Sequence, residues 1–294
     1  MRPRPRLTCS GSAYLPTLKE PPPDGARQTR KGAAAPERDI FSPLRQYERS
    51  WKIIIIRATY RLRGKGHFMI ALEGENMVVI GGSRGVGRRI FEAAIRNGAQ
   101  VLAVARQETP LQQLAHEVPG VETLALDATD EISPSKVFDG LMPDILILGG
   151  TFPPAASIHE QSWQQFSANW ENDVRIAFNF CKAAITRPLP VGTLVVIVSS
   201  GATLAGSPLS GEYAGAKRTQ IFIANNSQKE SDRLGLGLRF MTTMPRIVPD
   251  TDLGKHAITG YSRCLGISAD DFVRGMAAPP TSHIVATAVI ELVA

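Results

Sequence analysis

Residues 77–98 read MVVIGGSRGVGRRIFEAAIRNG, and this stretch decides the fold. Residues 77–80 form a short apolar run that predicts a buried strand, and a glycine-rich segment follows at once. Apolar residues then recur at helical spacing until Asn97-Gly98, a typical helix end. Strand, glycine turn and helix in this order offer backbone N–H groups and a positive helix end to a phosphate. We expect a phosphate-binding loop, rather than a glycine turn without a ligand, at Gly81, Ser83, Arg84, Gly85, Val86 and Gly87.

Five further apolar runs follow along the chain and alternate with segments of helical periodicity. The runs are short and rich in β-branched residues, as buried parallel strands are. This alternation predicts an α/β fold, a doubly wound parallel sheet (Rossmann-like) of about six strands with helices on both faces. The expected strands after the first are residues 101–105, 121–126, 144–148, 194–199 and 238–242, and a long helix is expected at about 162–185.

The residue after the second strand bears on the choice of cofactor. Dinucleotide folds place an acid there for the ribose hydroxyls of NAD, whereas arginine suits the phosphate of NADP. Here the position holds Arg106, and Arg84 in the glycine loop is a second candidate. We interpret both as phosphate ligands rather than solvated arginines, so the sequence predicts NADP as cofactor, with NADPH preferred over NADH.

A second chemical constellation comprises Tyr213, Lys217 and Ser200. Residues four apart on a helix share a face, so Tyr213 and Lys217 point the same way. A nearby cation favours the phenolate and brings a phenol closer to a useful acid–base range. Ser200 follows the apolar run 194–199, and catalytic groups of open α/β sheets gather at such carboxyl ends. A Tyr-x-x-x-Lys pair alone is also compatible with a surface tyrosine near a solvated lysine.

Charge is distributed unevenly over the 294 residues, whose formal net charge is +6. Residues 1–70 hold 15 Lys/Arg and 5 Asp/Glu, a net of +10, while residues 71–294 hold the remaining 18 and 22, a net of −4. A mildly acidic domain carrying a basic leader is not a nucleic-acid-binding protein by composition. No apolar run is long enough for a transmembrane helix, so we expect no membrane partner. The three cysteines, Cys9, Cys181 and Cys264, are far apart and odd in number, which suggests a reducing compartment, and we expect a cytoplasmic location.

The leader, residues 1–70, is rich in proline and arginine and has no sustained period. Such a segment buries too little apolar surface to offset its ordering entropy, so we expect disorder there. Three interpretations stay open: a transit peptide, a basic arm for an acidic partner, or an upstream extension without function. Residues 71–294 are expected to form the Rossmann-like domain.

Residues 76–294 resemble the short-chain dehydrogenases/reductases whose glycine loop is spaced G-x-x-x-G-x-G, here Gly81, Gly85 and Gly87. The resemblance implies that Ser200, Tyr213 and Lys217 are the catalytic serine, tyrosine and lysine. It also implies that Asp127 contacts the adenine ring and that Gly149, after the fourth strand, borders the cofactor. The tetrad asparagine of the family corresponds to Asp173 here, with Asn172 adjacent.

The sequence departs from the family pattern at four points. Ile80 replaces a threonine, Leu148-Gly149-Gly150-Thr151 replaces Asn-Asn-Ala-Gly, Arg246 replaces a glycine, and Asp173 replaces an asparagine. An aspartate near Lys217 would repel a tyrosinate and push the phenol pKa upward. The chain also stops at Ala294, inside what the resemblance makes its last helix. We therefore expect a sheet without a seventh strand, whose edge invites association unless an oligomer covers it.

The family activity is hydride transfer between a nicotinamide cofactor and a small-molecule carbonyl or alcohol. The resemblance implies that Tyr213 protonates the nascent alkoxide, Ser200 hydrogen-bonds the carbonyl oxygen, and Lys217 holds the nicotinamide ribose. Substrate choice would lie in residues 248–278, which include Tyr261 and Phe272. The alternative is a non-catalytic regulatory or scaffold protein that binds a nucleotide. A sugar epimerase fits less well, because such enzymes space their glycines differently.

Overall fold

The computed structural model describes residues 72–150 and 156–294. The predictions for the leader and for Thr151 lie outside these residues. The described part begins at Leu72, which is buried and whose N–H donates to Asn97 O at 2.7 Å.

Six parallel strands form one sheet in the order β3-β2-β1-β4-β5-β6. The chain builds outward from β1 to β3 and then returns to the other side of β1 with β4. Ligands of open α/β sheets bind at this switch point, beyond the carboxyl ends of the strands. The strands are β1 (Asn76–Ile80), β2 (Gln100–Ala105), β3 (Val121–Ala125), β4 (Ile145–Leu148), β5 (Leu194–Val198) and β6 (Arg239–Thr243).

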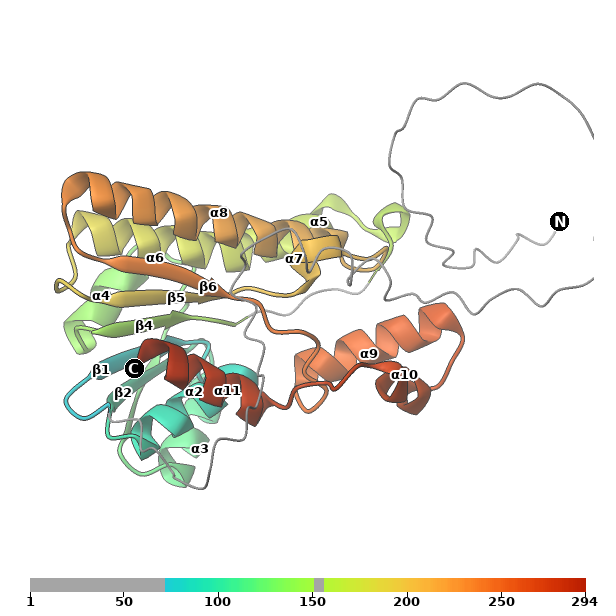
Figure 1. Cartoon of the computed structure of the whole chain (residues 1–294), viewed down its shortest axis with the longest axis horizontal. Coiled ribbons are helices and arrows are strands. Elements are labelled where there is room, and N and C mark those ends of the chain that lie inside the picture. The colour runs from blue at the N-terminus through green and yellow to red at the C-terminus, as the bar shows by residue number, and fades with distance from the viewer. Residues whose placement is uncertain (1–71, 151–155) are drawn as a thin grey trace, which may run out of the picture. The chain divides into compact units, whose positions relative to one another are not determined.

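Helices cover both faces of the sheet (Figure 1). Alternate strand residues point to opposite faces, so Val78 and Ile80 belong to one core while Met77 and Val79 belong to the other. The first core is closed by α4 (Ser133–Gly140), α6 (Arg175–Thr186) and α8 (Gly211–Leu234). The second is closed by α2 (Gly85–Arg96), α3 (Glu108–Glu117) and α11 (Ser282–Val293). The predicted doubly wound α/β fold is confirmed.

The long helix expected at 162–185 is interrupted in the structure. It consists of α5 (Trp163–Asn169), a π-helical turn η2 (Trp170–Val174) and α6, preceded by the short η1 (Ile158–Glu160). Gln220 of α8 donates to the backbone oxygen of Asp173 at 2.9 Å, inside this turn. Hydrophobic periodicity does not distinguish a widened turn from a regular one, and the interruption places Asp173 beside α8.

The segment expected to select substrate, residues 248–278, contains two helices. After β6 come α9 (Asp252–Leu265) and α10 (Ala269–Gly275), while the short α7 (Ala202–Ala205) follows β5. The rings of Tyr261 and Phe272 stack at 5.8 Å and join α9 to α10. In the described ranges, no helix is long and apolar enough to cross a membrane.

Candidate active site

Ser200, Tyr213 and Lys217 meet at the carboxyl edge of the sheet, as predicted. Ser200 lies two residues beyond β5, and the other two lie in the first turns of α8. The Ser200 and Tyr213 side chains are hydrogen-bonded, and Lys217 Nζ lies 5.8 Å from the centroid of the Tyr213 ring. The buried Ser199 hydroxyl donates to the Lys217 backbone oxygen at 2.9 Å, fixing α8 against the end of β5. A phenol, a hydroxyl and an ammonium group in contact can move a proton to or from a substrate oxygen.

Desolvation dominates the environment of the Tyr213 phenol and raises its pKa above the ordinary value. The charge of Lys217 and the hydrogen bond with Ser200 lower this pKa, while Asp173 and Tyr261 raise it. The net direction is upward. The charge of Lys217 therefore offsets only part of the rise in the Tyr213 pKa that burial, Asp173 and Tyr261 cause.

Asp173 contacts Lys217 directly. Its Oδ2 lies 3.2 Å from Nζ, and the two side chains are 0% and 2% exposed. Nζ also donates to the Val198 backbone oxygen at 3.1 Å. The other carboxylate oxygen of Asp173 accepts a hydrogen bond from Asn172 Nδ2 at 2.7 Å. The aspartate that replaces the family asparagine is thus part of a buried ion pair.

The glycine loop is packed too closely to admit side chains. Gly81 has a φ of +80°, and a Cβ there would lie 2.7 Å from Gly150 N. A Cβ on Gly87 would lie 2.4 Å from Gly81 O. The N-cap of α2, Arg84, makes no side-chain capping hydrogen bond, which leaves the first-turn N–H groups without that partner. A phosphate fits this arrangement, because such N–H groups and the helix dipole favour an anion.

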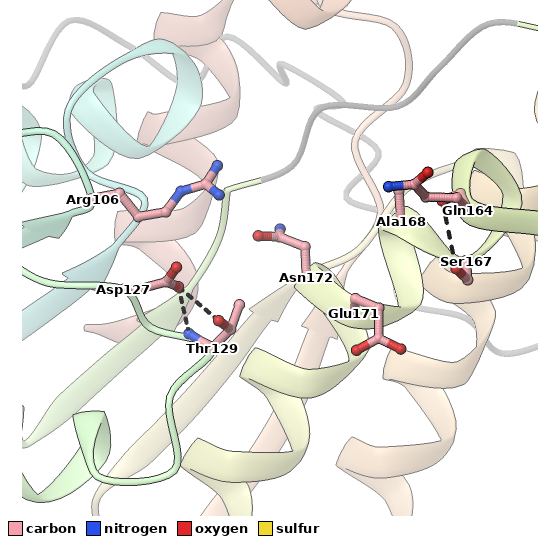
Figure 2. Close-up of a pocket in the computed structure, with 8 residues that line it drawn as sticks. All are labelled: Arg106, Asp127, Thr129, Gln164, Ser167, Ala168, Glu171 and Asn172. Carbon is pink, nitrogen blue, oxygen red and sulfur yellow. Dashed lines mark hydrogen bonds between the residues drawn. The ribbon is translucent and has the colours of Figure 1, made fainter.

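A pocket of 380 Å³ lies beyond the ends of β2 and β3. Figure 2 shows Arg106 and Asp127 on one wall, and Asn172, Glu171 and helix α5 on the other. Asp127 Oδ1 accepts from Thr129 N at 2.9 Å and from Thr129 Oγ1 at 2.8 Å. These hydrogen bonds, with the charge of Arg106, lower the pKa of Asp127. Two predicted cofactor residues therefore border one cavity.

The wall of this pocket opposite Arg106 and Asp127 was not predicted from the sequence. Four of its residues recur at the spacing of one helical face, a signal that is readable from the sequence. The residues not predicted are Thr129, Gln164, Ser167, Ala168, Glu171 and Asn172.

The remaining predicted cofactor residues take different positions. Arg84 points to Asp252 at the start of α9, with 3.9 Å between Nη1 and Oδ2 and both side chains well exposed. Val86 packs against the second core, so only its backbone is suited to a ligand. Ser83 is half-buried in the loop. Gly149 donates its N–H to Ile80 O at 3.0 Å and lies beside the glycine loop.

Three of the departures from the family pattern have a structural account. Ile80 and Leu148 are register partners on β1 and β4 and are both buried, so apolar packing braces the sheet where the family uses polar groups. Arg246 donates to Ala278 O at 3.0 Å. In the described ranges, Ala278 is the single non-glycine residue with a positive φ. The backbone of Arg246 therefore has a negative φ, and an arginine in place of the family glycine causes no left-handed strain at this position.

The comparisons with known proteins show the family of this chain. A family model described as short chain dehydrogenase matches residues 75–262, more than half of the chain. The chain belongs to the short chain dehydrogenase family. It is 29% identical over 153 residues to L-xylulose reductase of Bos taurus, covering 50% of this chain and 62% of that protein. It is 24% identical over 162 residues to Carbonyl reductase [NADPH] 2 of Sus scrofa, covering 53% of this chain and 66% of that protein.

The solved structures show the same fold. A dehydrogenase/reductase from Sinorhizobium meliloti is similar with a TM-score of 0.63 and 21% identity, over 76% of this chain and 90% of that chain. The sequence alignment with the bovine relative spans less than two thirds of its length. Short chain dehydrogenases use nicotinamide cofactors, which the glycine loop and the pocket fit.

Proposed function

We propose that this chain is an NADP(H)-dependent oxidoreductase that transfers a hydride between nicotinamide and a carbonyl or alcohol substrate. The observation that carries the proposal is the contact of Ser200, Tyr213 and Lys217 beside a glycine loop that admits a phosphate. The bound cofactor would supply or accept the hydride. Gly81, Ser83, Arg84, Gly85, Val86, Gly87, Arg106, Asp127 and Gly149 are the proposed cofactor-binding residues.

In carbonyl reduction, the Tyr213 hydroxyl would donate its proton to the substrate oxygen as negative charge develops there. Ser200 is hydrogen-bonded to this phenol and would orient the same oxygen. Lys217 would hold the nicotinamide ribose through an N–H that is not donated to Val198. Positioning and proton transfer are therefore the protein's contribution.

The substrate is proposed to be small and rich in hydroxyl groups. Two observations support this class. The aligned relatives include proteins named L-xylulose reductase and D-erythrulose reductase. Near Tyr213, Tyr261 Oη lies 2.7 Å from Ser207 Oγ, which lies 2.9 Å from Ser210 Oγ, so a group of hydroxyls would be at hand for a hydroxylated substrate.

The competing candidate is a nucleotide-binding protein without turnover. The ion pair of Asp173 with Lys217 favours it, because the pair partly neutralises the cation beside Tyr213. The contact of Tyr213 with Ser200 favours the enzyme candidate, because a protein that only binds a cofactor does not require this pair.

Turnover discriminates the two candidates. We would assay the full chain with NADPH and a panel of ketoses, aldoses and simple ketones, comparing wild type with Tyr213→Phe. The enzyme proposal predicts activity in wild type and a loss of kcat/KM of about 100-fold or more in the variant. NADPH affinity should stay within about twofold, since the phenol acts on substrate. NADPH binding without turnover on the whole panel would favour the scaffold.

A further inference from the structure

Lys217 is held inside the protein by one hydrogen bond and one ion pair. Nζ lies 3.1 Å from the Val198 oxygen and 3.2 Å from Asp173 Oδ2. A lysine ammonium has three N–H donors, and the hydrogen bond to Val198 uses one of them, so donors are left for a ligand. The ion pair is almost completely buried, where a charge without a partner is costly.

Asp173 is itself fixed from three sides. The π turn η2 carries its backbone, and such turns occur frequently at functional sites. Gln220 of α8 binds its backbone oxygen at 2.9 Å, while Asn172 binds Oδ1 at 2.7 Å. Only Oδ2 is left to face Lys217, and it has no other partner among the described residues.

We propose that Asp173 is a positioning residue that holds Lys217 by a direct ion pair and sets how strongly this cation acts on Tyr213. The charged and titratable groups that face Tyr213 are Lys217 of α8, Asp173 of η2 and Tyr261 of α9, with the Ser200 hydroxyl beyond β5. Asp173 weakens the effect of Lys217 and also repels a tyrosinate directly. The site is thereby tuned to keep Tyr213 protonated, as the general acid of reduction requires.

The test uses the full chain and two readouts. Asp173→Asn removes the charge at nearly constant size, and Asp144→Asn is the matched control. Asp144 is a half-buried carboxylate that accepts a hydrogen bond from Asn76 N at 2.9 Å, at the amino end of β4 and away from the site. The first readout is tyrosinate absorbance against pH, with the Tyr213 signal assigned by subtracting Tyr213→Phe in each background. It needs no turnover, so its result is independent of the proposed function.

We expect the Tyr213 midpoint to fall by about one pH unit in Asp173→Asn, because a nearby like charge is removed. Asp144→Asn and the charge-conserving Asp173→Glu should keep the wild-type midpoint. The second readout rests on the proposed function: the basic limb of the pH–rate profile for carbonyl reduction should move to lower pH in Asp173→Asn, because the acid form of Tyr213 is lost earlier.

An unchanged Tyr213 midpoint in Asp173→Asn, with folding verified by circular dichroism, overturns the inference. Asp173→Ser is a second neutral variant should asparagine prevent folding. If both neutral variants fail to fold while Asp173→Glu is fully active, the ion pair serves stability alone and the inference is also overturned.

Discussion

Arg106 lies at the end of β2 and lines the pocket that Asp127 shares, whereas Arg84 faces Asp252. Arg106 therefore has the better placement for the NADP phosphate. We predict that Arg106→Asp shifts the difference in binding free energy between NADPH and NADH toward NADH by roughly 1.5–3 kcal/mol. This is the value of a charge-assisted hydrogen bond. Titration of the full chain with each cofactor measures it.

The matched control is Arg239→Asp, which changes an exposed arginine at the amino end of β6 by the same charge. Equal loss of selectivity in both variants would assign the effect to overall charge. If the ratio of NADPH affinity to NADH affinity is unchanged in Arg106→Asp, Arg106 does not bind the NADP phosphate and the prediction is wrong.

At the residue scale, the sequence predicted which side chains meet because they follow strand ends or share a helix face. Ser200 and Tyr213 are brought together for this reason. The pairing of Arg84 with Asp252 was not predicted, since it joins segments 168 residues apart whose contact depends on the packing of α9. The direct contact of Asp173 with Lys217 depends on a π turn that periodicity does not indicate.

At the scale of elements, the first turn of α8 holds a second buried acid, Glu212. Burial raises its pKa, and the neighbouring Gln161 amide opposes this only in part. A raised folded-state pKa means that the protonated form stabilises the protein. That stability is fully present below the unfolded pKa of about 4.3 and is lost as pH rises through the folded-state pKa.

We therefore predict that Glu212→Gln raises the thermal unfolding temperature at neutral pH. The gain over wild type should shrink on acidification and vanish below about pH 4, where both side chains are neutral. Thermal unfolding followed by circular dichroism across this range is the measurement. Glu131→Gln, an exposed acid, is the control and should show no such trend. A constant difference at every pH would mean that the substitution acts by packing.

The strands were the most predictable elements, since each is a short β-branched run whose observed ends lie within a residue or two of the expected ones. The helices after β6 were not predicted. They pack on each other through Tyr261 of α9 and Phe272 of α10, and a contact between two separate helices leaves no mark in the periodicity of either one.

At the scale of the whole molecule, β6 pairs with β5 alone within the described residues. Unpaired strand edges invite association. We predict that the full chain forms oligomers or aggregates in analytical ultracentrifugation. Thr242→Lys, a charge on this edge, should reduce association, whereas Thr186→Lys on an exposed turn of α6 should not. A stable monomer at high concentration would contradict the prediction.

Hydride transfer at this site is tested most directly by following a label from the cofactor to the product. The full chain is incubated with NADPH deuterated at the transferable hydrogen and with the carbonyl panel, and the products are analysed by mass spectrometry. The proposed function predicts an alcohol with one deuterium on its carbinol carbon, and a loss of this product in Tyr213→Phe. Absence of label from every product, with NADPH bound, would contradict the account.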